Sequence, residues 1–407
     1  MNPVIVIPSY WTDGADKKDP RAPGAYDYAT PVTKPLPELE NCLSSLENVR
    51  GVLRVIVLVV APHSCEDSAR ARVNSICRSH PALNAMAIGS LEGECVVRQI
   101  ARISGKGGGD TTSMRGYGAI RNMGLALACI FGHDSIVFMD DDEVALSPDF
   151  LIDAIYGLGA YTRQDLRILA KSGYYVRPDG SPYAKVDTSW SERHWTKHES
   201  FNDLMRRYLT APTRIVRSNY LCGGCCALHA AAFTKVPFDP YITRGEDLDY
   251  LLNLRYHGLD VWFDNVLSVR MQPPEEMAPT PSIFMQDVYR WFYEYRKLEF
   301  MNTRRELRQV TPESLMPYPG PWLSSRARSN VRSTAFRRFL ATDEHGEYFS
   351  ILTRGIGSAD AYAKANASRY LSFAASWEDV AAGLWDDRYL QSEILKSASV
   401  ALRRSNA

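Results

Sequence analysis

A chain of 407 residues can form one large domain or two, and its hydrophobic fraction of 45% is that of an ordinary globular protein. Forty-seven Lys and Arg residues balance 47 Asp and Glu residues, so the basic excess of a nucleic-acid-binding protein is absent. The N-terminus has no basic segment followed by a long apolar one, and the longest apolar run, 52–61, is interrupted by Arg54. The sequence therefore predicts a cytoplasmic protein without a nucleic-acid partner.

Apolar strands alternate with amphipathic helices through the first part of the chain. We expect, in chain order, a strand at 4–8, a helix around 39–46, a strand at 52–60, a helix opened by a capping box of Ser64 and Asp67, a strand at 84–88, a helix around 120–131 and a strand at 135–139. This alternation is typical of an α/β fold with a parallel sheet and crossover helices. Ligands of such sheets bind beyond the carboxyl ends of the strands, where residues 8–10 and 140–142 lie.

The second part of the chain changes character twice. Residues 171–195 are polar and aromatic with turn residues, which predicts hairpins and loops over a site. The next expected elements are a helix from Leu248 to Arg255, two strands at 261–263 and 266–269, and helices marked by apolar residues at 284–295 and 377–394. We therefore predict an α/β domain over 1–274 and a mostly helical C-terminal extension over 275–407.

Two acidic motifs stand out. Asp140, Asp141 and Asp142 follow the strand at 135–139, and three adjacent carboxylates at a sheet edge cost stability unless a cation or a basic partner neutralises them. A divalent metal is the simplest such partner, and an acidic turn capping the next helix is the alternative. Glu246 and Asp247 form the second motif, which is also what an ordinary helix N-terminus looks like.

Five segments form a recognisable series along the chain: Val4–Tyr10, Ala119–Leu125, Phe138–Asp142, Phe238-Asp239 and Gly245–Asp249. Together these segments resemble the family 2 glycosyltransferases of the GT-A fold. Their order and approximate spacing match the family over about the first 270 residues. The resemblance implies a Rossmann-like, mostly parallel sheet with flanking helices, in which 1–274 binds a nucleotide sugar and carries out catalysis.

The resemblance also implies roles at the donor site. Pro8, Ser9 and Tyr10 would approach the base and ribose, and Asp140 would contact both nucleotide and metal. Asp142 would bind Mn²⁺ or Mg²⁺, and Asp141 would either join the nucleotide contacts or point away. Arg121 would lie near the donor with Arg115 as a second cation, unless Arg121 is only a salt-bridged helix residue.

Catalysis in this family implies a carboxylate base near the anomeric carbon. By resemblance Asp247 is that base, and Glu246 binds or orients the acceptor. The implied activity is transfer of a hexose from a nucleoside-diphosphate sugar to a hydroxyl of a saccharide, a lipid-linked acceptor or a small molecule.

The sequence departs from the family pattern at two places. Val60-Ala61-Pro62-His63 stands where relatives carry an aspartate that reads the base, which leaves the base undetermined. Arg270-Met271-Gln272 stands where many relatives place a metal-binding histidine, so either Gln272 binds the metal weakly or Arg270 neutralises the diphosphate directly. The missing histidine favours an inverting mechanism over that of the retaining relatives that glycosylate phosphoglycerate or glycerate.

Two other classes remain as alternatives. A nucleotidyltransferase would carry a Gly-rich signature with Arg and Lys after the first strand, and 8–16 lacks one. A non-catalytic nucleotide-sugar-binding protein would account for the missing aspartate and histidine, although it would not need the retained Asp142 and Asp247.

Four further segments have open interpretations. The insertion Thr12–Pro35 is expected to overhang the donor pocket, and Ser104–Asp110 is either a mobile surface loop or a phosphate cradle. The segment Cys222–Cys226 is either a structural strand or half of a metal or redox site. From 290 to 338 basic residues outnumber acidic ones eleven to four, which predicts either a solvated helix face or peripheral contact with an anionic membrane at its inner face.

Overall fold

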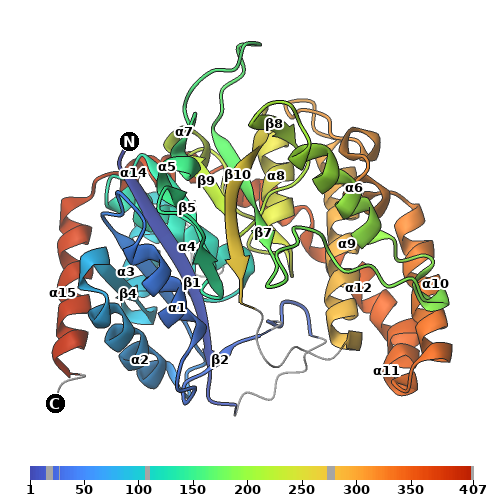
Figure 1. Cartoon of the computed structure of the whole chain (residues 1–407), viewed down its shortest axis with the longest axis horizontal. Coiled ribbons are helices and arrows are strands. Elements are labelled where there is room, and N and C mark those ends of the chain that lie inside the picture. Colours follow the sequence, from blue (N-terminus) through green and yellow to red (C-terminus); the bar gives the residue numbers. More distant parts are fainter. Residues whose placement is uncertain (15–21, 27, 106–110, 273–279, 405–407) are drawn as a thin grey trace.

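A mixed ten-stranded sheet forms the centre of the molecule, seen in the computed structural model (Figure 1). The structure describes residues 1–14, 22–26, 28–105, 111–272 and 280–404. Along the sheet the strands follow the order β4-β3-β1-β5-β9-β7-β10-β6, with β2 beside β1 and β8 beside β10. The strands are β1 (Pro3–Thr12), β2 (Thr30–Pro31), β3 (Val55–Val60), β4 (Ala85–Ile88), β5 (Ser135–Phe138), β6 (Glu143–Ala145), β7 (Ala170–Val176), β8 (Ile215–Ser218), β9 (Cys226–His229) and β10 (Val261–Met271).

Helices cover both faces of the sheet and make up the C-terminal part. They are α1 (Glu38–Glu47), α2 (Glu66–Ser79), α3 (Ser90–Ser104), α4 (Tyr117–Ile130), α5 (Phe150–Ile155), α6 (Lys197–Leu209), α7 (Ala230–Phe233), α8 (Glu246–Tyr256), α9 (Thr280–Met301), α10 (Arg326–Ala341), α11 (His345–Ser350), α12 (Ile356–Asn366), α13 (Arg369–Ala374), α14 (Trp377–Leu384) and α15 (Arg388–Arg404). The predicted α/β class with a helical C-terminal part is confirmed. The predicted boundary between residues 274 and 275 lies outside the described residues.

The pairing of β1 and β5 sets the position of the first acidic motif. These strands run parallel, with Val6 opposite Phe138, the last residue of β5, so the segment 140–142 that follows β5 lies beside residues 8–10. The strand predicted to end at residue 8 was too short, because β1 continues to Thr12 and residues 8–10 still pair with β3. Strand β9 runs antiparallel between β5 and β7, which makes the sheet mixed at this point.

Both faces of β1 are buried, which explains its continuous apolar sequence. Val4 and Val6 face a core that also contains residues of α4, α8 and α9. Ile5 and Ile7 face a second core with residues of α1, α2 and α6. The C-terminal helices extend the first core and do not form a separate one.

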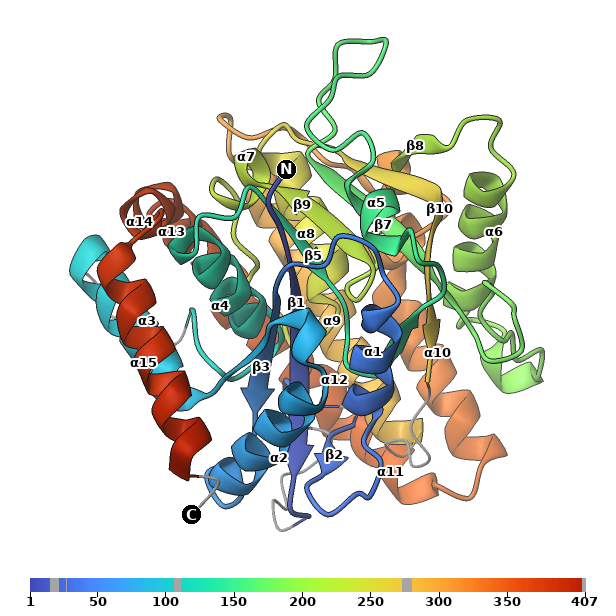
Figure 2. The same ribbon diagram turned by 60° about the vertical axis from the view of Figure 1, so that its left-hand side comes forward.

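The C-terminal helices pack at two places on the α/β part. In Figure 1, α9 to α12 gather at the right of the sheet, whereas α15 lies at the left. Figure 2 shows α14 and α15 beside α3 and α4, and contacts join these helices. Across the described ranges, no helix has both the length and the apolar character that a membrane span requires.

A buried lysine ties α9 to the α/β part. Lys297 Nζ lies 2.6 Å from Asp239 Oδ2 and 2.6 Å from Asp249 Oδ1, and all three side chains are fully buried. Burial alone would lower the pKa of Lys297, yet the two aspartates hold it above its ordinary value. Tyr293 also donates to Asp239 at 2.7 Å. Asp239 and Asp249 belong to two of the segments that carry the sequence resemblance, and here they bind Lys297 of α9.

Replacing Lys297 by methionine should lower the free energy of unfolding by about 3–5 kcal/mol, because both aspartates would lose their buried cation. Urea unfolding followed by circular dichroism measures this loss. Lys364→Met is the matched control, since Lys364 pairs with Asp360 at the surface and its loss should change stability by only ~0.5 kcal/mol. Equal unfolding midpoints for the two variants would contradict the assigned role of Lys297.

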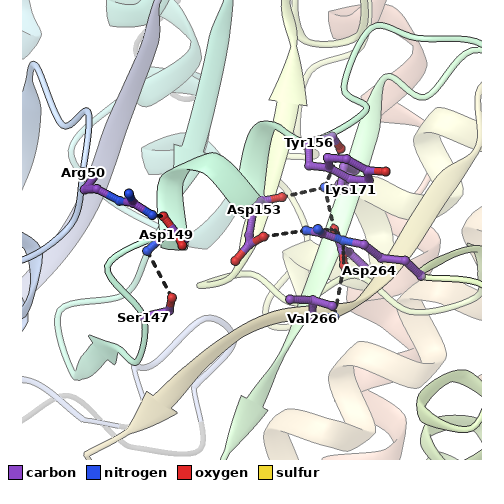
Figure 3. A network of polar contacts seen from close by, with 9 residues as sticks. Arg50, Ser147, Asp149, Asp153, Tyr156, Lys171, Asp264 and Val266 are labelled. Atoms are coloured by element: carbon purple, nitrogen blue, oxygen red, sulfur yellow. Dashed lines mark hydrogen bonds and ion pairs between the residues drawn. The ribbon is translucent and has the colours of Figure 1, made fainter.

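A second buried lysine fixes the beginning of β7. Figure 3 shows Lys171 between the carbonyl oxygens of Asp153 and Tyr156, each 2.8 Å away, and the carboxylate of Asp264, 2.7 Å away. Arg214 bonds both Asp264 and Asp153. Burial would raise the pKa of Asp264, but Arg214 and Lys171 hold it below its ordinary value. The network joins α5, β7 and β10.

Candidate functional site

A cavity of about 360 Å³ lies at the carboxyl ends of β1 and β5. Most of the residues expected at the site line it, together with residues from distant segments. The lining residues are Pro8, Tyr10, Tyr26, Tyr28, Thr30, Tyr117, Arg121, Asp140, Asp141, Asp142, Tyr175, Gly223, Arg244, Gly245, Glu246, Asp247 and Arg290. Both acidic motifs thus face one space.

The three aspartates of the first motif have different partners. Asp140 Oδ1 accepts a hydrogen bond from Arg121 Nη2 at 2.8 Å. Asp141 accepts one from the Ser9 hydroxyl at 2.5 Å, and the Asp142 carbonyl accepts one from the backbone N–H of Gln272 at 2.7 Å. Ser9 is fully buried, so it supports Asp141 from behind the cavity wall.

Burial and mutual repulsion disfavour negative charge on this motif. Burial, followed by the charge of Asp140, raises the pKa of Asp142 to about 7. Burial and Asp142 raise the pKa of Asp141, and burial and Asp140 raise that of the neighbouring Glu143. Within the described ranges, Arg121 is the one cation in direct ion-pair contact with this group. Such crowded carboxylates suit a bound cation.

The predicted metal ligands are only partly brought together. Asp140 and Asp142 line the cavity, and carboxylate oxygens suit Mg²⁺ or Mn²⁺, which usually take one or two protein carboxylates besides phosphate and water. Gln272 does not line the cavity, and its side chain accepts from Asn41 at 2.9 Å. In the part of the chain that the structure describes, no three His, Cys, Asp or Glu residues are grouped to hold a metal ion. Gln272 instead supports the backbone of Asp142.

Arg121 joins the two acidic motifs. Its side chain is 6% exposed, and its Nε donates to Glu246 Oε1 at 3.2 Å while Nη2 donates to Asp140. Burial raises the pKa of Glu246 although Arg121 opposes the shift. A side chain at Gly223 would approach Arg121 Nη2 to 3.1 Å, so this glycine leaves room for the guanidinium. The structure thus shows Arg121 as a salt-bridged helix residue on the cavity wall, and its predicted position near a donor remains a prediction.

Asp247 lies in the first turn of α8 and is the more accessible acid of the second motif. Its side chain is 25% exposed, compared with 10% for Glu246. Asp247 Oδ1 accepts from the N–H of Leu248 at 2.7 Å and lies 3.8 Å from Arg290 Nη2. Gly245 precedes the helix with a φ of 73°, and a side chain there would collide with Arg290. The glycine therefore permits both the turn and the approach of Arg290.

The sequence pointed to Tyr10, but not to the two tyrosines beside it, Tyr26 and Tyr117. Tyr10 and Tyr26 have ring centroids 4.2 Å apart, and the Tyr26 hydroxyl accepts from the N–H of Gly116 at 2.7 Å. Tyr117 adds a third ring, 5.0 Å from Tyr26. The insertion Thr12–Pro35, which was expected to overhang the pocket, contributes Tyr26, Tyr28 and Thr30 to the cavity lining. Residues 15–21 and 27 of this insertion lie outside the described residues.

Other predicted features lie apart from the cavity. Arg115 is exposed and does not line it, and most of Ser104–Asp110 lies outside the described residues. Cys222, Cys225 and Cys226 are buried and free, which agrees with the structural interpretation of that segment.

Several basic residues of 290–338 pair with acidic residues elsewhere in the chain. Lys297 is buried, Arg338 pairs with Glu192, Arg296 with Asp360, and Arg308 with Asp260. These pairs balance part of the basic excess of the segment.

Comparisons with known proteins found relatives only among solved structures. No protein-family model and no curated protein matches the chain. A mannosyltransferase, PcManGT from Pyrobaculum calidifontis in complex with GDP-Man and Mn²⁺, is 14% identical and aligns over 95% of this chain and 87% of its own, with a TM-score of 0.46. Glucosyl-3-phosphoglycerate synthase from Mycobacterium tuberculosis with phosphoglyceric acid is 13% identical over 70% and 75%, with a TM-score of 0.35. GalNAc-T7 with UDP, GalNAc and Mn²⁺ is 13% identical over 86% and 58%, with a TM-score of 0.36.

These identities and TM-scores are low, so the fold class rests on the strand order and the flanking helices described above. That architecture agrees with the GT-A class implied by the sequence resemblance.

Proposed function

We propose that this protein is a glycosyltransferase that moves a sugar from a nucleoside-diphosphate sugar to a hydroxyl acceptor with the help of Mn²⁺ or Mg²⁺. The observation that carries the proposal is Arg121, which joins Asp140 of one acidic motif to Glu246 of the other inside one cavity.

The donor would lie across the ends of β1 and β5. Pro8 and Tyr10 line this part of the cavity, and the rings of Tyr26 and Tyr117 beside Tyr10 offer an aromatic wall for a base. Asp140 and Asp142 would hold the metal ion, which neutralises the departing diphosphate when bound. Arg121 and Arg290 add fixed positive charge on the cavity wall.

Asp247 would act as the general base of a single displacement with inversion. The acceptor oxygen attacks the anomeric carbon, the bond from that carbon to the diphosphate oxygen breaks with its electron pair, and the acceptor proton moves to Asp247. The exposure of Asp247 to the cavity suits this task, whereas Glu246 is held by Arg121 and suits positioning of the acceptor. Transfer of a hexose by inversion is thus the specific form of the proposal.

A donor panel tests the proposal. UDP-, GDP- and dTDP-sugars are incubated with the protein and manganese, and the released nucleoside diphosphate is measured by chromatography and mass spectrometry. We expect release from one donor, which identifies base and sugar together, and loss of release when the metal is chelated. Binding of a nucleoside diphosphate without release from any donor, even with a panel of hydroxyl acceptors, would instead indicate a binding protein.

A further inference from the structure

A second cavity, of about 310 Å³, is lined by four arginines from four segments. Arg207 comes from α6, Arg217 from β8, Arg255 from the last turn of α8, and Arg308 from the segment after α9. No acidic side chain is among the described residues that line this cavity. It shares no lining residue with the cavity of the acidic motifs.

The arginines of this cavity have too few acidic partners. Asp260 accepts from Arg217 Nη2 at 2.7 Å and from Arg308 Nη1 at 2.9 Å, so one carboxylate serves two guanidinium groups. Arg207 is exposed, and among the described residues no hydrogen bond or ion pair joins its side chain to another residue. The cavity therefore carries an excess of positive charge, although the whole chain is balanced.

Arg255 is the buried member of the group. The residue is 6% exposed, and its Nη2 donates to two neutral oxygens, the Ser218 carbonyl at 2.8 Å and Asn219 Oδ1 at 2.6 Å. Its Nε is buried without a hydrogen-bond partner among the described residues. Burial, together with the charges of Arg217 and Arg308, lowers the pKa of Arg255 to about 10, although Asp260 opposes the shift. A buried cation beside like charges is stabilised when an anion binds next to it.

We propose that this four-arginine cavity binds a small anion that carries a phosphate group. Several planar guanidinium groups around one space match the oxygens of a phosphate, which accept paired hydrogen bonds from arginine. Arg217 and Arg308 have side chains 53% and 37% exposed, so a ligand can reach the cavity from solvent. A volume of about 310 Å³ suits a small molecule.

The site is separate from the proposed donor site but joined to it by one helix. Glu246 and Asp247 lie in the first turn of α8 and Arg255 in its last turn, so the two ends of an 11-residue helix are roughly 15 Å apart. Arg308 also donates its backbone N–H to the Tyr256 carbonyl at 2.9 Å, which fixes the end of this helix. The proposal does not depend on the glycosyltransferase activity, because none of the residues that line the four-arginine cavity lines the proposed donor site.

The test is calorimetric titration of the full chain with inorganic phosphate, pyrophosphate and glucose 6-phosphate in the presence of a metal chelator. Wild type should bind at least one of these probes, and the Arg207→Gln, Arg308→Gln double variant should bind it about tenfold more weakly or not at all. Arg206→Gln is the matched control, because Arg206 neighbours Arg207 on α6, pairs with Asp203 and does not line the cavity. Preference for inorganic phosphate or pyrophosphate would identify a free ion, and preference for glucose 6-phosphate a phosphate ester.

Two outcomes would overturn the proposal. One is the absence of binding heat with all three probes in wild type. The other is equal affinity in wild type and the double variant, which would place the anion elsewhere, for example at the donor site. The unfolding temperature without phosphate should be the same in both proteins within a few degrees, because Arg207 and Arg308 are exposed. The single variant Arg207→Gln keeps every ion pair of the described residues and gives a second comparison if the double variant folds poorly.

Discussion

Replacing Asp247 by asparagine should lower turnover by about 10²–10⁴-fold while leaving the affinity for the donor unchanged. The amide has the shape of the carboxylate and can still accept from the N–H of Leu248, so the start of α8 should be preserved. It cannot take up the proton of the acceptor hydroxyl, which is the step assigned to Asp247. The loss should therefore affect kcat and spare nucleotide binding.

Asp67→Asn is the matched control for this variant. Asp67 is an exposed aspartate in the first turn of α2 and does not line the cavity. The Asp67→Asn variant should therefore retain full turnover. Initial rates and calorimetric donor titrations of both variants separate catalysis from binding. Wild-type turnover in Asp247→Asn would remove Asp247 from the catalytic role.

Replacing Asp142 by asparagine should abolish the gain in nucleotide affinity that manganese provides. The variant removes one of the two carboxylates that would hold the metal, and Asp140 alone is already engaged by Arg121. Calorimetric titration with UDP and GDP, with and without manganese, measures the gain. We expect at least a tenfold gain in wild type, about 1.4 kcal/mol of binding free energy, and none in the variant.

Asp149→Asn provides the control for this loss. Asp149 follows β6 in the chain, pairs with Arg50 and does not line the cavity. The Asp149→Asn variant should therefore keep the manganese effect. A manganese effect of wild-type size in Asp142→Asn would show that the metal site was assigned to the wrong carboxylate.

Much of the α/β part could be predicted because its strands are buried on both faces. The expected strands at 4–8, 52–60, 84–88 and 135–139 correspond to β1, β3, β4 and β5. The capping box of Ser64 and Asp67 was wrong, because Cys65 N–H bonds the Pro62 carbonyl in a turn and α2 begins only at Glu66 without a side-chain cap. The hairpins and loops expected over 171–195 were partly wrong, because Ala170–Val176 forms strand β7, which lies inside the sheet between β9 and β10.

The residues of the candidate site that could be predicted are those that follow a strand or begin a helix. The acidic motifs belong to this group, because local sequence pattern and strand register decide their position. Arg290 and Tyr175 could not be found in this way, since α9 and β7 reach the cavity through long-range packing. Lys297 likewise looked like one of many basic residues, and only the tertiary structure shows its two aspartate partners.

The measurement that tests the central claim most directly is hydrogen exchange of the wild-type backbone with and without manganese and a nucleoside diphosphate, UDP or GDP. If the nucleotide binds where we propose, the amides that gain protection should cluster at 9–12, 139–143 and 244–248, the segments that contribute lining residues to the cavity. Binding of UDP or GDP that leaves these three segments unprotected and protects another region would contradict the assignment of this cavity as the donor site.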